Sequence, residues 1–472
     1  MGRADHRQHC VANTPRVVPL AIQQKAWRVS FWARAGGSRV KSAGGRWHER
    51  CPTRVHHKSR FPSLSTNSQL RFASFVAAAL IPIAVLWLLP TVSDATSILR
   101  AAFGRNRRKA AAVSEDVGRQ RLLFLVPAHN ESLLVGRCVR SLSAMSRKRA
   151  DFVVVVVADN CEDDTGAVAA SAGARVLTRV DLARPGKPNA IQWALDQLPL
   201  SAFDAITIVD ADTIVEPGFA GAIAGMGPLR AKAVQTYNGI ANEGDSWLTC
   251  LGGLLVRVRY DGQFILKSLA GLNCPMANGM TMGTDLLLRS GWASSSLTEN
   301  WELYARWTAL GERIDFAPHA RLGSQEAKSL TQSSTQRRRW QAGRWLVFQQ
   351  YAATIVRSSK IGWPQKIDAL AELSAPGPVL HASIATVLTV LMALLPGLLP
   401  KVIAAAFAIS LVPTLVWTGL AVQRESNRGE IVRALARLPF YAVWRVLVAI
   451  MAVSTARRGA WHRSPRHIPE PT

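Results

Sequence analysis

The sequence is short of acidic residues and of cysteine, and it lacks a glycine-rich dinucleotide fingerprint. Asp and Glu number 31 against 57 Lys and Arg, which gives a formal net charge of +26 over 472 residues. The six cysteines form no C-x-x-C pair, which argues against a zinc site or a disulfide framework and predicts reduced thiols in a cytosolic compartment. No G-x-G-x-x-G follows the first expected strand, which argues against a nicotinamide-dependent oxidoreductase.

The excess of positive charge belongs mainly to the ends of the chain. Residues 1–60 hold thirteen Lys and Arg, with only Asp5 and Glu49 as acids. A strongly basic chain can bind nucleic acid, an anionic membrane or phosphorylated small molecules. The middle of the chain is closer to balance and carries no helix-turn-helix, zinc-finger or aromatic RNA-binding motif, so we expect no nucleic-acid partner. For residues 1–66 we expect disorder, with a transit peptide or an over-extended start site as the alternatives.

Three long apolar stretches predict membrane helices. Residues 72–89 carry no charge, and we expect one transmembrane helix over 67–93, because a span needs about 20 apolar residues. Two more stretches, divided at Pro400-Lys401, predict a transmembrane hairpin over 377–423. Basic residues follow the first and the last stretch, which favours a cytoplasmic position for the region between them. The basic residues before the first stretch argue for the opposite orientation.

The rest of the chain divides by composition. Residues 94–119 are expected to be a basic linker and 120–345 a folded domain. Residues 346–376 and 424–472 mix apolar faces with Arg and Lys, which is typical of helices at a membrane surface. Within 120–345, short apolar runs alternate with helical patterns, and this alternation predicts an α/β fold with a mostly parallel sheet.

Polar residues follow three of the expected strands, at the end where such sheets bind ligands. The run 205–209 ends in Asp210 and Asp212, whose side chains share one face because strand residues alternate. Two neighbouring carboxylates repel each other unless a cation lies between them, and Mg²⁺ typically binds one or two carboxylates together with substrate phosphates. The alternative is a turn with solvated acids. The other two strands end in His129-Asn130-Glu131 and in Asp159-Asn160.

Three further segments carry candidate side chains. Lys187 lies in a Gly-Pro-rich loop before a helix, where lysine and helix amides suit a phosphate, although a glycine turn with a solvated lysine is common. Glu299 and Glu302 lie near a helix start, where acids are favoured anyway. The segment 336-QRRRWQAGRW-345 suits either a membrane-interface anchor or an arginine paired with phosphate.

The motifs together resemble a known family. VPAHNE (126–131), VADN (157–160), GKPNA (186–190), VDADT (209–213), LTEN (297–300) and QRRRW (336–340) occur in order. This order and spacing resemble the family 2 glycosyltransferases, and within them the membrane-embedded branch of cellulose, chitin and hyaluronan synthases. The resemblance covers about residues 120–345 and the flanking membrane pattern.

The resemblance implies a GT-A fold that binds a nucleotide-sugar donor, with a UDP-sugar preferred, together with Mg²⁺ or Mn²⁺. It implies that the donor is bound by His129, Asn130, Glu131, Asp159, Lys187, Asp210 and Asp212, of which Asp210 and Asp212 also hold the metal. It places Gln336, Arg339 and Trp340 at the acceptor and the diphosphate. Residues 277–292 resemble the family's glycine-rich acceptor loop, with Asp285 where Arg or Lys is expected.

One position departs from the family pattern. The catalytic base of the family is an aspartate, and the matching residue here is Asn300, whose amide cannot accept a proton. Glu299 or Glu302 would then act as the base, with Glu299 preferred. The alternative is a catalytically degenerate protein that binds donor or glycan and assists a partner synthase.

The resemblance also bears on acceptor and location. It implies a multi-pass protein of the plasma or inner membrane with a cytoplasmic catalytic domain, acting in cell-surface or exopolysaccharide synthesis. The acceptor would be a glycan or a lipid-linked molecule. About three spans are fewer than the larger polysaccharide synthases use for their own channel, so an export partner is also consistent with the sequence.

Overall fold

The computed structural model describes residues 66–103, 118–292, 298–425 and 427–458, with side chains up to residue 452. Every described residue belongs to one compact unit of the chain. The expected disordered extension over 1–66, most of the expected linker and the end of the C-terminal tail lie outside the described residues.

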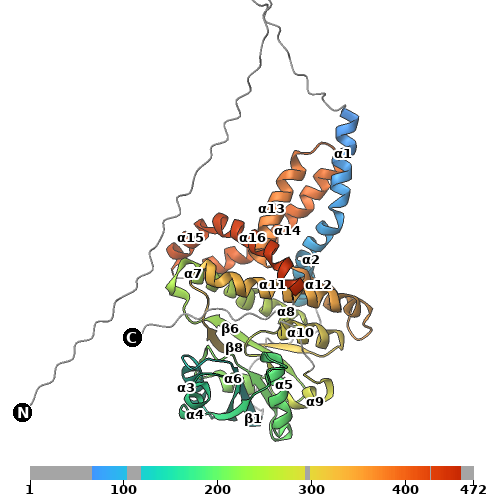
Figure 1. Ribbon diagram of the computed structural model, residues 1–472. Coiled ribbons are helices and arrows are strands. Elements are labelled where there is room, and N and C mark those ends of the chain that lie inside the picture. The colour runs from blue at the N-terminus through green and yellow to red at the C-terminus, as the bar shows by residue number, and fades with distance from the viewer. Residues whose placement is uncertain (1–65, 104–117, 293–297, 426, 459–472) are drawn as a thin grey trace, which may run out of the picture. The chain divides into compact units, whose positions relative to one another are not determined.

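An eight-stranded sheet forms the centre of the expected folded domain (Figure 1). Its strands are β1 (Gln120–Ala128), β2 (Ala150–Asp159), β3 (Arg175–Arg179), β4 (Ala205–Ile208), β5 (Thr213–Val215), β6 (Ala233–Ile240), β7 (Thr281–Gly283) and β8 (Ile314–Ser324), in the order β3-β2-β1-β4-β7-β6-β8-β5. The first four pair in parallel, as do β6 and β8, while β7 and β5 run antiparallel to their neighbours. The predicted mostly parallel α/β sheet is therefore confirmed.

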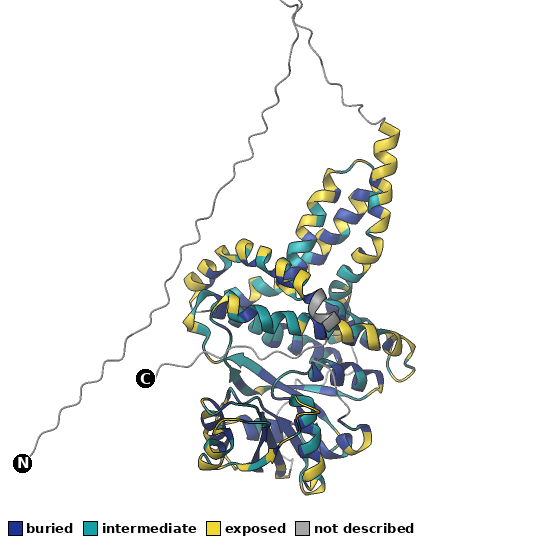
Figure 2. Ribbon diagram, viewed as in Figure 1, coloured by how far each residue is buried: buried dark blue, intermediate teal, exposed yellow. Residues whose placement is uncertain are grey.

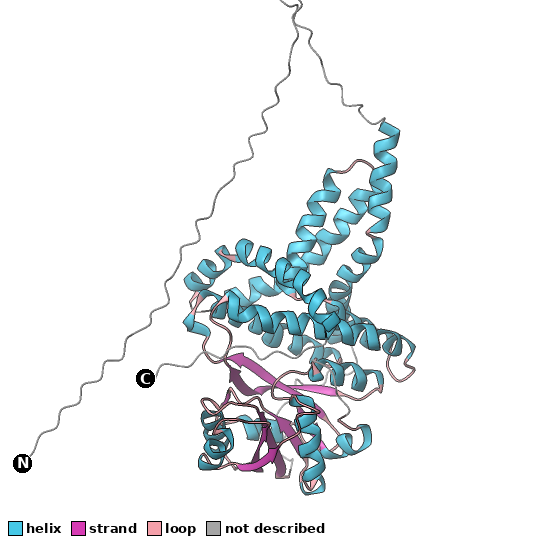
Figure 3. Cartoon of the chain, viewed as in Figure 1, coloured by secondary structure: helices cyan, strands magenta, loops and turns pink. Residues whose placement is uncertain are grey.

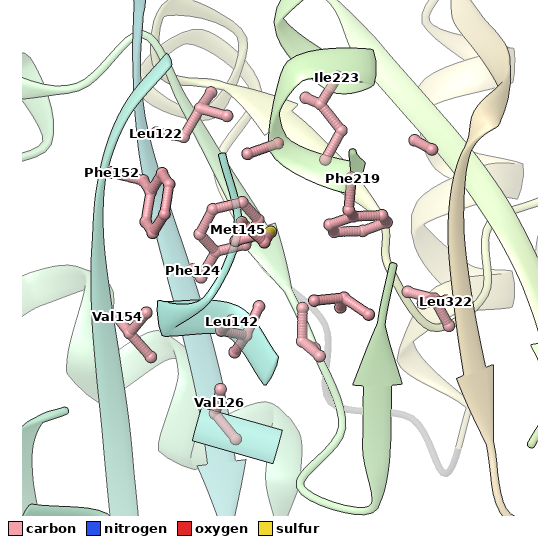
Figure 4. Packing of buried hydrophobic residues seen from close by; sticks show 14 of the residues in the cluster. Leu122, Phe124, Val126, Leu142, Met145, Phe152, Val154, Phe219, Ile223 and Leu322 are labelled. Carbon is pink, nitrogen blue, oxygen red and sulfur yellow. The ribbon is translucent and has the colours of Figure 1, made fainter. Parts of the chain in front are cut away.

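Both faces of the sheet are covered, which explains why its strands are apolar almost throughout. Leu122, Phe124 and Val126 alternate onto one face, where they pack with α3 (Val135–Ser143) and α6 (Phe219–Ala224) (Figure 4). Leu123 and Leu125 face the other side, against α5 (Lys187–Gln197), α9 (Thr284–Ser290) and α10 (Glu299–Ala309). Burial of each such side chain contributes about 1.5–3 kcal/mol.

Several short helices and two long helical segments complete this part of the chain. The short helices are α4 (Thr165–Ser171), η1 (Leu200–Ala202) and η2 (Glu243–Asp245), and one continuous helical run contains α7 (Trp247–Arg257), the π-helical η3 (Val258–Phe264) and α8 (Ile265–Ala270). The long helix α11 (Leu330–Arg357) is capped by Ser329, whose side chain accepts a hydrogen bond from the Gln332 amide at 3.3 Å. α11 continues through residue 345, so the expected domain end falls inside a helix, because no proline or capping residue interrupts it there.

The remaining helices are predominantly apolar: α1 (Thr66–Ala79), α2 (Ile81–Phe103), α12 (Trp363–Ser374), α13 (Pro378–Leu394), α14 (Leu398–Gln423), α15 (Arg428–Ala436) and α16 (Leu438–Arg458). By length and composition α2 and α14 could each cross a membrane, and the number rises to four if α12 with α13 and α15 with α16 each form one bent span. Figure 3 shows these helices grouped beyond the sheet, and Figure 2 shows how much of α1, α2, α13 and α14 is exposed.

The first long apolar helix begins later in the chain than the predicted span. A break at Leu80 separates α1 from α2, and the long apolar helix is 81–103 rather than 67–93. The span over 67–93 stays a prediction, but the helix itself continues past residue 93, where the polar side chains are bonded inside the protein. The Ser93 hydroxyl donates to Asp368 at 2.7 Å, and Asp94 accepts from the Trp417 indole at 2.9 Å.

Candidate functional site

A cavity of about 1010 Å³ opens where the carboxyl ends of β1, β2 and β4 meet the first turns of α5 and α10 and one face of α11. It brings together most of the residues that the sequence singles out: His129, Glu131, Asp159, Lys187, Asp210, Asp212, Glu299, Asn300, Gln336, Arg339 and Trp340. Asn130 and Glu302 do not line it. Six motifs spread over more than 200 residues of chain therefore meet at one place.

Lys187 connects two of these motifs. Its Nζ lies 2.7 Å from Asp210 Oδ1 and 2.8 Å from Glu299 Oε1. Burial by itself would lower the pKa of Lys187, but the two carboxylates outweigh burial and raise the pKa above its ordinary value. A permanent cation therefore lies between two acids at the mouth of the sheet.

Local backbone geometry places Lys187 at this point. Gly186 precedes α5 with φ of +106°, a conformation that glycine adopts without strain, and Lys187 and Pro188 form the first turn of the helix. Pro188 has no N–H group, and the Asn189 and Ala190 amides donate to the Gly186 oxygen at 3.1 Å, so the lysine is the main cationic group of this turn. Helix N-termini favour anions, so the lysine and the turn together suit a phosphate group.

Asn278 holds the D-x-D turn, a role that the sequence did not reveal. Its side-chain oxygen accepts from the Asp210 amide at 2.9 Å, and its amide donates to Thr213 Oγ1 at 2.7 Å and Ser324 Oγ at 2.8 Å. Gly279 follows with φ of +79°, and a Cβ there would meet Thr236 Oγ1 at 2.1 Å. In the sequence, the Ala-Asn-Gly motif at 277–279 was the feature that could have indicated this role.

The expected acceptor loop over 277–292 is only partly at the cavity. Residues 277, 278 and 280 line it, whereas Asp285 lies on α9 and pairs with Arg230 at 2.8 Å. The unexpected acid at 285 is thus explained by an ion pair that lies away from the cavity.

The ends of β1 and β2 support each other. Asn130 and Asn160 have φ of +53° and +49°, left-handed conformations that asparagine tolerates better than most residues. His129 Nδ1 lies 2.8 Å from the backbone oxygen of Asp159, and the Asp159 carboxylate pairs with buried Arg179 at 2.5 Å. Arg179 was also missed, because it ends the edge strand β3, whose other residues are exposed or partly buried and where an arginine is not unusual.

Two expected site residues turn away from the cavity. The Asn130 side chain accepts from the Glu162 amide at 2.8 Å, so it shapes the loop between β1 and α3. Glu302 lies one turn deeper along α10 and accepts from the Tyr351 hydroxyl of α11 at 3.4 Å. The donor contact expected of Asn130 and the catalytic role expected of Glu302 stay predictions, although neither residue lines the cavity.

Asn300 has a structural partner. Its amide donates to the Met276 backbone oxygen at 3.0 Å, which ties the start of α10 to the segment before Asn278. A carboxylate at this position could not donate, and it would lie against a carbonyl oxygen. This contact gives a physical reason for asparagine where the family pattern has aspartate.

The Q-x-x-R-W helix approaches α10 closely because of Gly343. A Cβ at residue 343 would lie 2.5 Å from Thr298 Cγ2, the residue directly before Glu299. The same helix presents Gln336 and Trp340 to the cavity, and one turn later Arg344, whose guanidinium lies 5.2 Å from the centre of the Trp301 ring. Arg259 of η3 and Arg445 of α16 also line the cavity, and the sequence gave no reason to expect either there.

The acidic residues fit a divalent cation that shares its ligands with a substrate. Within the described ranges, no three or more His, Cys, Asp or Glu side chains gather as a self-sufficient metal site. Asp210 and Asp212 nevertheless offer hard oxygen donors at the wall of a cavity that has room for further ligands. Mg²⁺ is commonly bound in this way, with one or two carboxylates and the phosphates of a substrate.

Comparisons with known proteins agree with this arrangement. Residues 120–343 match the family model "Glycosyltransferase like family 2". The probable glycosyltransferase YdaM of Bacillus subtilis (strain 168) is 24% identical over 245 residues, which cover 48% of this chain and 56% of that protein. The match thus spans little more than half the length of this curated relative.

A solved structure shows the same fold. The mannosyltransferase PcManGT from Pyrobaculum calidifontis, in complex with GDP-Man and Mn²⁺, aligns with a TM-score of 0.50 at 18% identity, covering 78% of this chain and 98% of that one. The likeness bears out the expected GT-A-like α/β fold. The family model thus matches 224 of the 472 residues, and the structural likeness shows the fold of that region.

Proposed function

We propose that the protein is a membrane-bound, inverting glycosyltransferase that moves a sugar from a nucleotide-sugar donor to a glycan or lipid-linked acceptor. The observation that carries the proposal is the contact of Lys187 with both Asp210 and Glu299 inside one cavity. These three residues come from three motifs, and they place a phosphate-binding cation, a metal-binding carboxylate and a candidate base together. PcManGT, bound to GDP-Man and Mn²⁺, supports a nucleotide-sugar donor.

The proposed reaction needs no covalent intermediate. The acceptor oxygen bonds to the anomeric carbon from one face while the bond from that carbon to the diphosphate breaks on the other, which inverts the configuration. The bonding electrons leave with the nucleoside diphosphate, and the acceptor proton passes to Glu299. Holding the two reactants in line removes much of the entropic barrier.

Charge on the leaving diphosphate is the main electrostatic problem. Asp210 and Asp212 would hold Mg²⁺ or Mn²⁺, and the bound ion would offset part of that charge. Lys187 and Arg339 extend the positive surroundings from the chain's own side chains. Preorganised charges of this kind are often the largest single contribution to catalysis.

Glu299 is the proposed base because it lines the cavity and contacts Lys187, whereas Glu302 faces α11. We expect Glu299→Gln to lower turnover about 10²–10⁴-fold. Asn300→Asp should not raise it, since the new carboxylate would lose the bond to Met276. Activity that arises only on Asn300→Asp would favour the degenerate, donor-binding alternative.

A membrane location is supported by the apolar helices α2 and α14 and by their exposed side chains, among them Leu99, Val402 and Leu415. We place the sugar-transfer domain on the cytoplasmic side of the plasma or inner membrane and, by resemblance, near the cellulose, chitin and hyaluronan synthase branch. Cell-surface or exopolysaccharide synthesis, with a partner for export, follows from that placement.

The decisive experiment incubates the full-length protein in membranes with a panel of UDP- and GDP-sugars and measures release of the nucleoside diphosphate. We expect release that requires Mn²⁺ or Mg²⁺ and stops with EDTA or in Asp212→Asn. Asp196→Asn is the matched control, since Asp196 is exposed on α5 outside the cavity. Metal-independent release, or an equal loss in both variants, would overturn the proposal.

A further inference from the structure

The end of the cavity formed by α11, η3 and α16 is rich in arginine. Arg259, Arg344 and Arg445 all line it, and we call them the arginine end. They come from three helices and are separated by more than 80 residues of chain. None of them belongs to the six motifs quoted from the sequence, and we call the part of the cavity lined by His129, Asp159, Lys187, Asp210 and Asp212 the donor end.

At the arginine end, the guanidinium groups outnumber the carboxylates that pair with them. Arg259 pairs with Glu372 at 2.6 Å. None of the carboxylates that the structure describes lies within 4.0 Å of the Arg344 or Arg445 guanidinium. Arg445 is nevertheless only 9% exposed.

Guanidinium groups that lie close together without counter-ions destabilise the folded state unless an anion neutralises them. A buried cation without a counter-ion loses hydration, and neighbouring cations repel it. Burial, followed by the charge of Arg259, lowers the pKa of Arg344 to about 10, while Glu372 offsets only part of the effect. An anion at this end would remove the imbalance.

We propose that the arginine end binds the phosphate of a lipid-anchored phosphate ester, and that this ester is the acceptor. Guanidinium groups bind phosphate oxygens in a two-pronged geometry, and they lose less hydration energy than ammonium groups do. This inference rests on the proposed function, because it names the acceptor class of the same cavity.

The surroundings explain why the phosphate carries a lipid. Pro378 and Val379 at the start of α13 line the same cavity as Arg445. α13 continues from there with exposed apolar side chains, among them Val387 and Leu391. An alkyl chain could therefore lie against apolar helices while its phosphate reaches the arginines.

The arginine end is connected to the donor end through residues of α10 and α11. The guanidinium of Arg344 lies over the Trp301 ring, and Trp301 is two residues after Glu299. A phosphate held by the arginine end would thus place the acceptor beside the proposed base, which is what in-line transfer requires.

The test uses the full-length protein in neutral detergent and dodecyl phosphate as the probe, with dodecanol and inorganic phosphate as parallel arms. Binding is measured by thermal shift and by isothermal titration for wild type, Arg445→Gln and Arg344→Gln. Arg433→Gln is the matched control, since it removes an exposed arginine of α15 outside the cavity. Binding of UDP with Mn²⁺ is measured on the same samples.

We expect dodecyl phosphate to bind wild type and Arg433→Gln equally, and to bind Arg445→Gln and Arg344→Gln at least about tenfold more weakly. Without ligand, Arg445→Gln should melt no lower than wild type, because one repulsive charge is gone. Dodecanol should not bind. Inorganic phosphate that binds as tightly as the ester would overturn the lipid source and assign the subsite to a soluble phosphate compound.

Equal binding of dodecyl phosphate to all four proteins, with UDP binding intact, would overturn this inference and leave the proposed function standing. If UDP with Mn²⁺ fails to bind the folded wild type, the proposed function is overturned instead. If Arg445→Gln does not fold, Arg344→Gln carries the comparison, because its half-buried side chain is easier to replace.

Discussion

Two lysines of this protein each bridge two carboxylates, yet they lie in very different surroundings. Lys187 contacts Asp210 and Glu299 at the cavity wall, and its side chain is 30% exposed. Lys267 of α8 contacts Asp368 and Glu372 of α12 inside the protein, and its side chain is 5% exposed. The same set of charges is open to ligands in one region and closed to them in the other.

The difference shows that a charged cluster can take part in chemistry only where ligands can reach its side chains. At the cavity, a metal ion and a diphosphate can take over the contacts that Lys187 makes. Lys267 does not line the cavity, the Ser93 hydroxyl of α2 adds to its cluster through Asp368, and Glu372 of the cluster also pairs with Arg259. It joins an apolar helix to the helices beside the domain, so we expect it to set stability rather than chemistry.

The largest effect should come from Lys267→Met. Removing one member of a buried ion pair leaves an uncompensated charge and costs about 3–5 kcal/mol of unfolding free energy. Chemical denaturation in detergent measures this loss. Lys328→Met is the control, since its pair with Asp245 is more than a third exposed and should cost no more than about 1 kcal/mol. Equal losses in the two variants would remove the distinction between the clusters.

Lys187→Met should separate activity from stability. Loss of this cation from the donor end should lower turnover about 10²–10³-fold, as removal of a preorganised electrostatic group does. Unfolding free energy should change by no more than about 1 kcal/mol, because water reaches the side chains. Nucleoside diphosphate release and denaturation are measured together, with exposed Lys148→Met as the control. A variant that unfolds but turns over normally when folded would contradict this expectation.

Gly343→Ala should lower both the turnover and the free energy of unfolding. Its Cβ would meet Thr298 at 2.5 Å, so α11 must move away from α10. Overpacking of this kind costs about 1–3 kcal/mol, and displacement of the adjacent Glu299 should lower turnover about tenfold or more. Gly419→Ala on α14 is the matched control, because nothing lies within 4 Å of its added Cβ. Unchanged turnover in Gly343→Ala would mean that α10 is not positioned through this contact.

The smallest effect should come from Ser93→Ala. The hydroxyl donates to the buried Asp368 carboxylate at 2.7 Å, and loss of that bond should cost about 1–2 kcal/mol without changing turnover per folded molecule. Ser171→Ala, which removes an exposed hydroxyl that bonds its own helix, should change stability by less than about 0.5 kcal/mol. A loss of turnover in Ser93→Ala would instead connect the buried cluster to the chemistry.

Local patterns predicted the sheet well and the apolar helices less well. The runs before Ala128, Asp159 and Asp210 are strands because their side chains are apolar on both faces. The helix α2 continues past residue 93 although hydropathy treats Ser93 and Asp94 as an end. Their partners, Asp368 and Trp417, lie more than 270 residues away in the chain.

The sequence by itself determined that carboxylates and amides end the parallel strands, because strand periodicity and strand ends are local properties. Only the tertiary structure decided that Lys187 meets Glu299, that Asn278 holds the D-x-D turn, and that Arg344 and Arg445 share one end of the cavity. Those contacts join residues from separate elements, and no pattern within one element specifies them. Packing of α10, α11 and α16 around the sheet decides them instead.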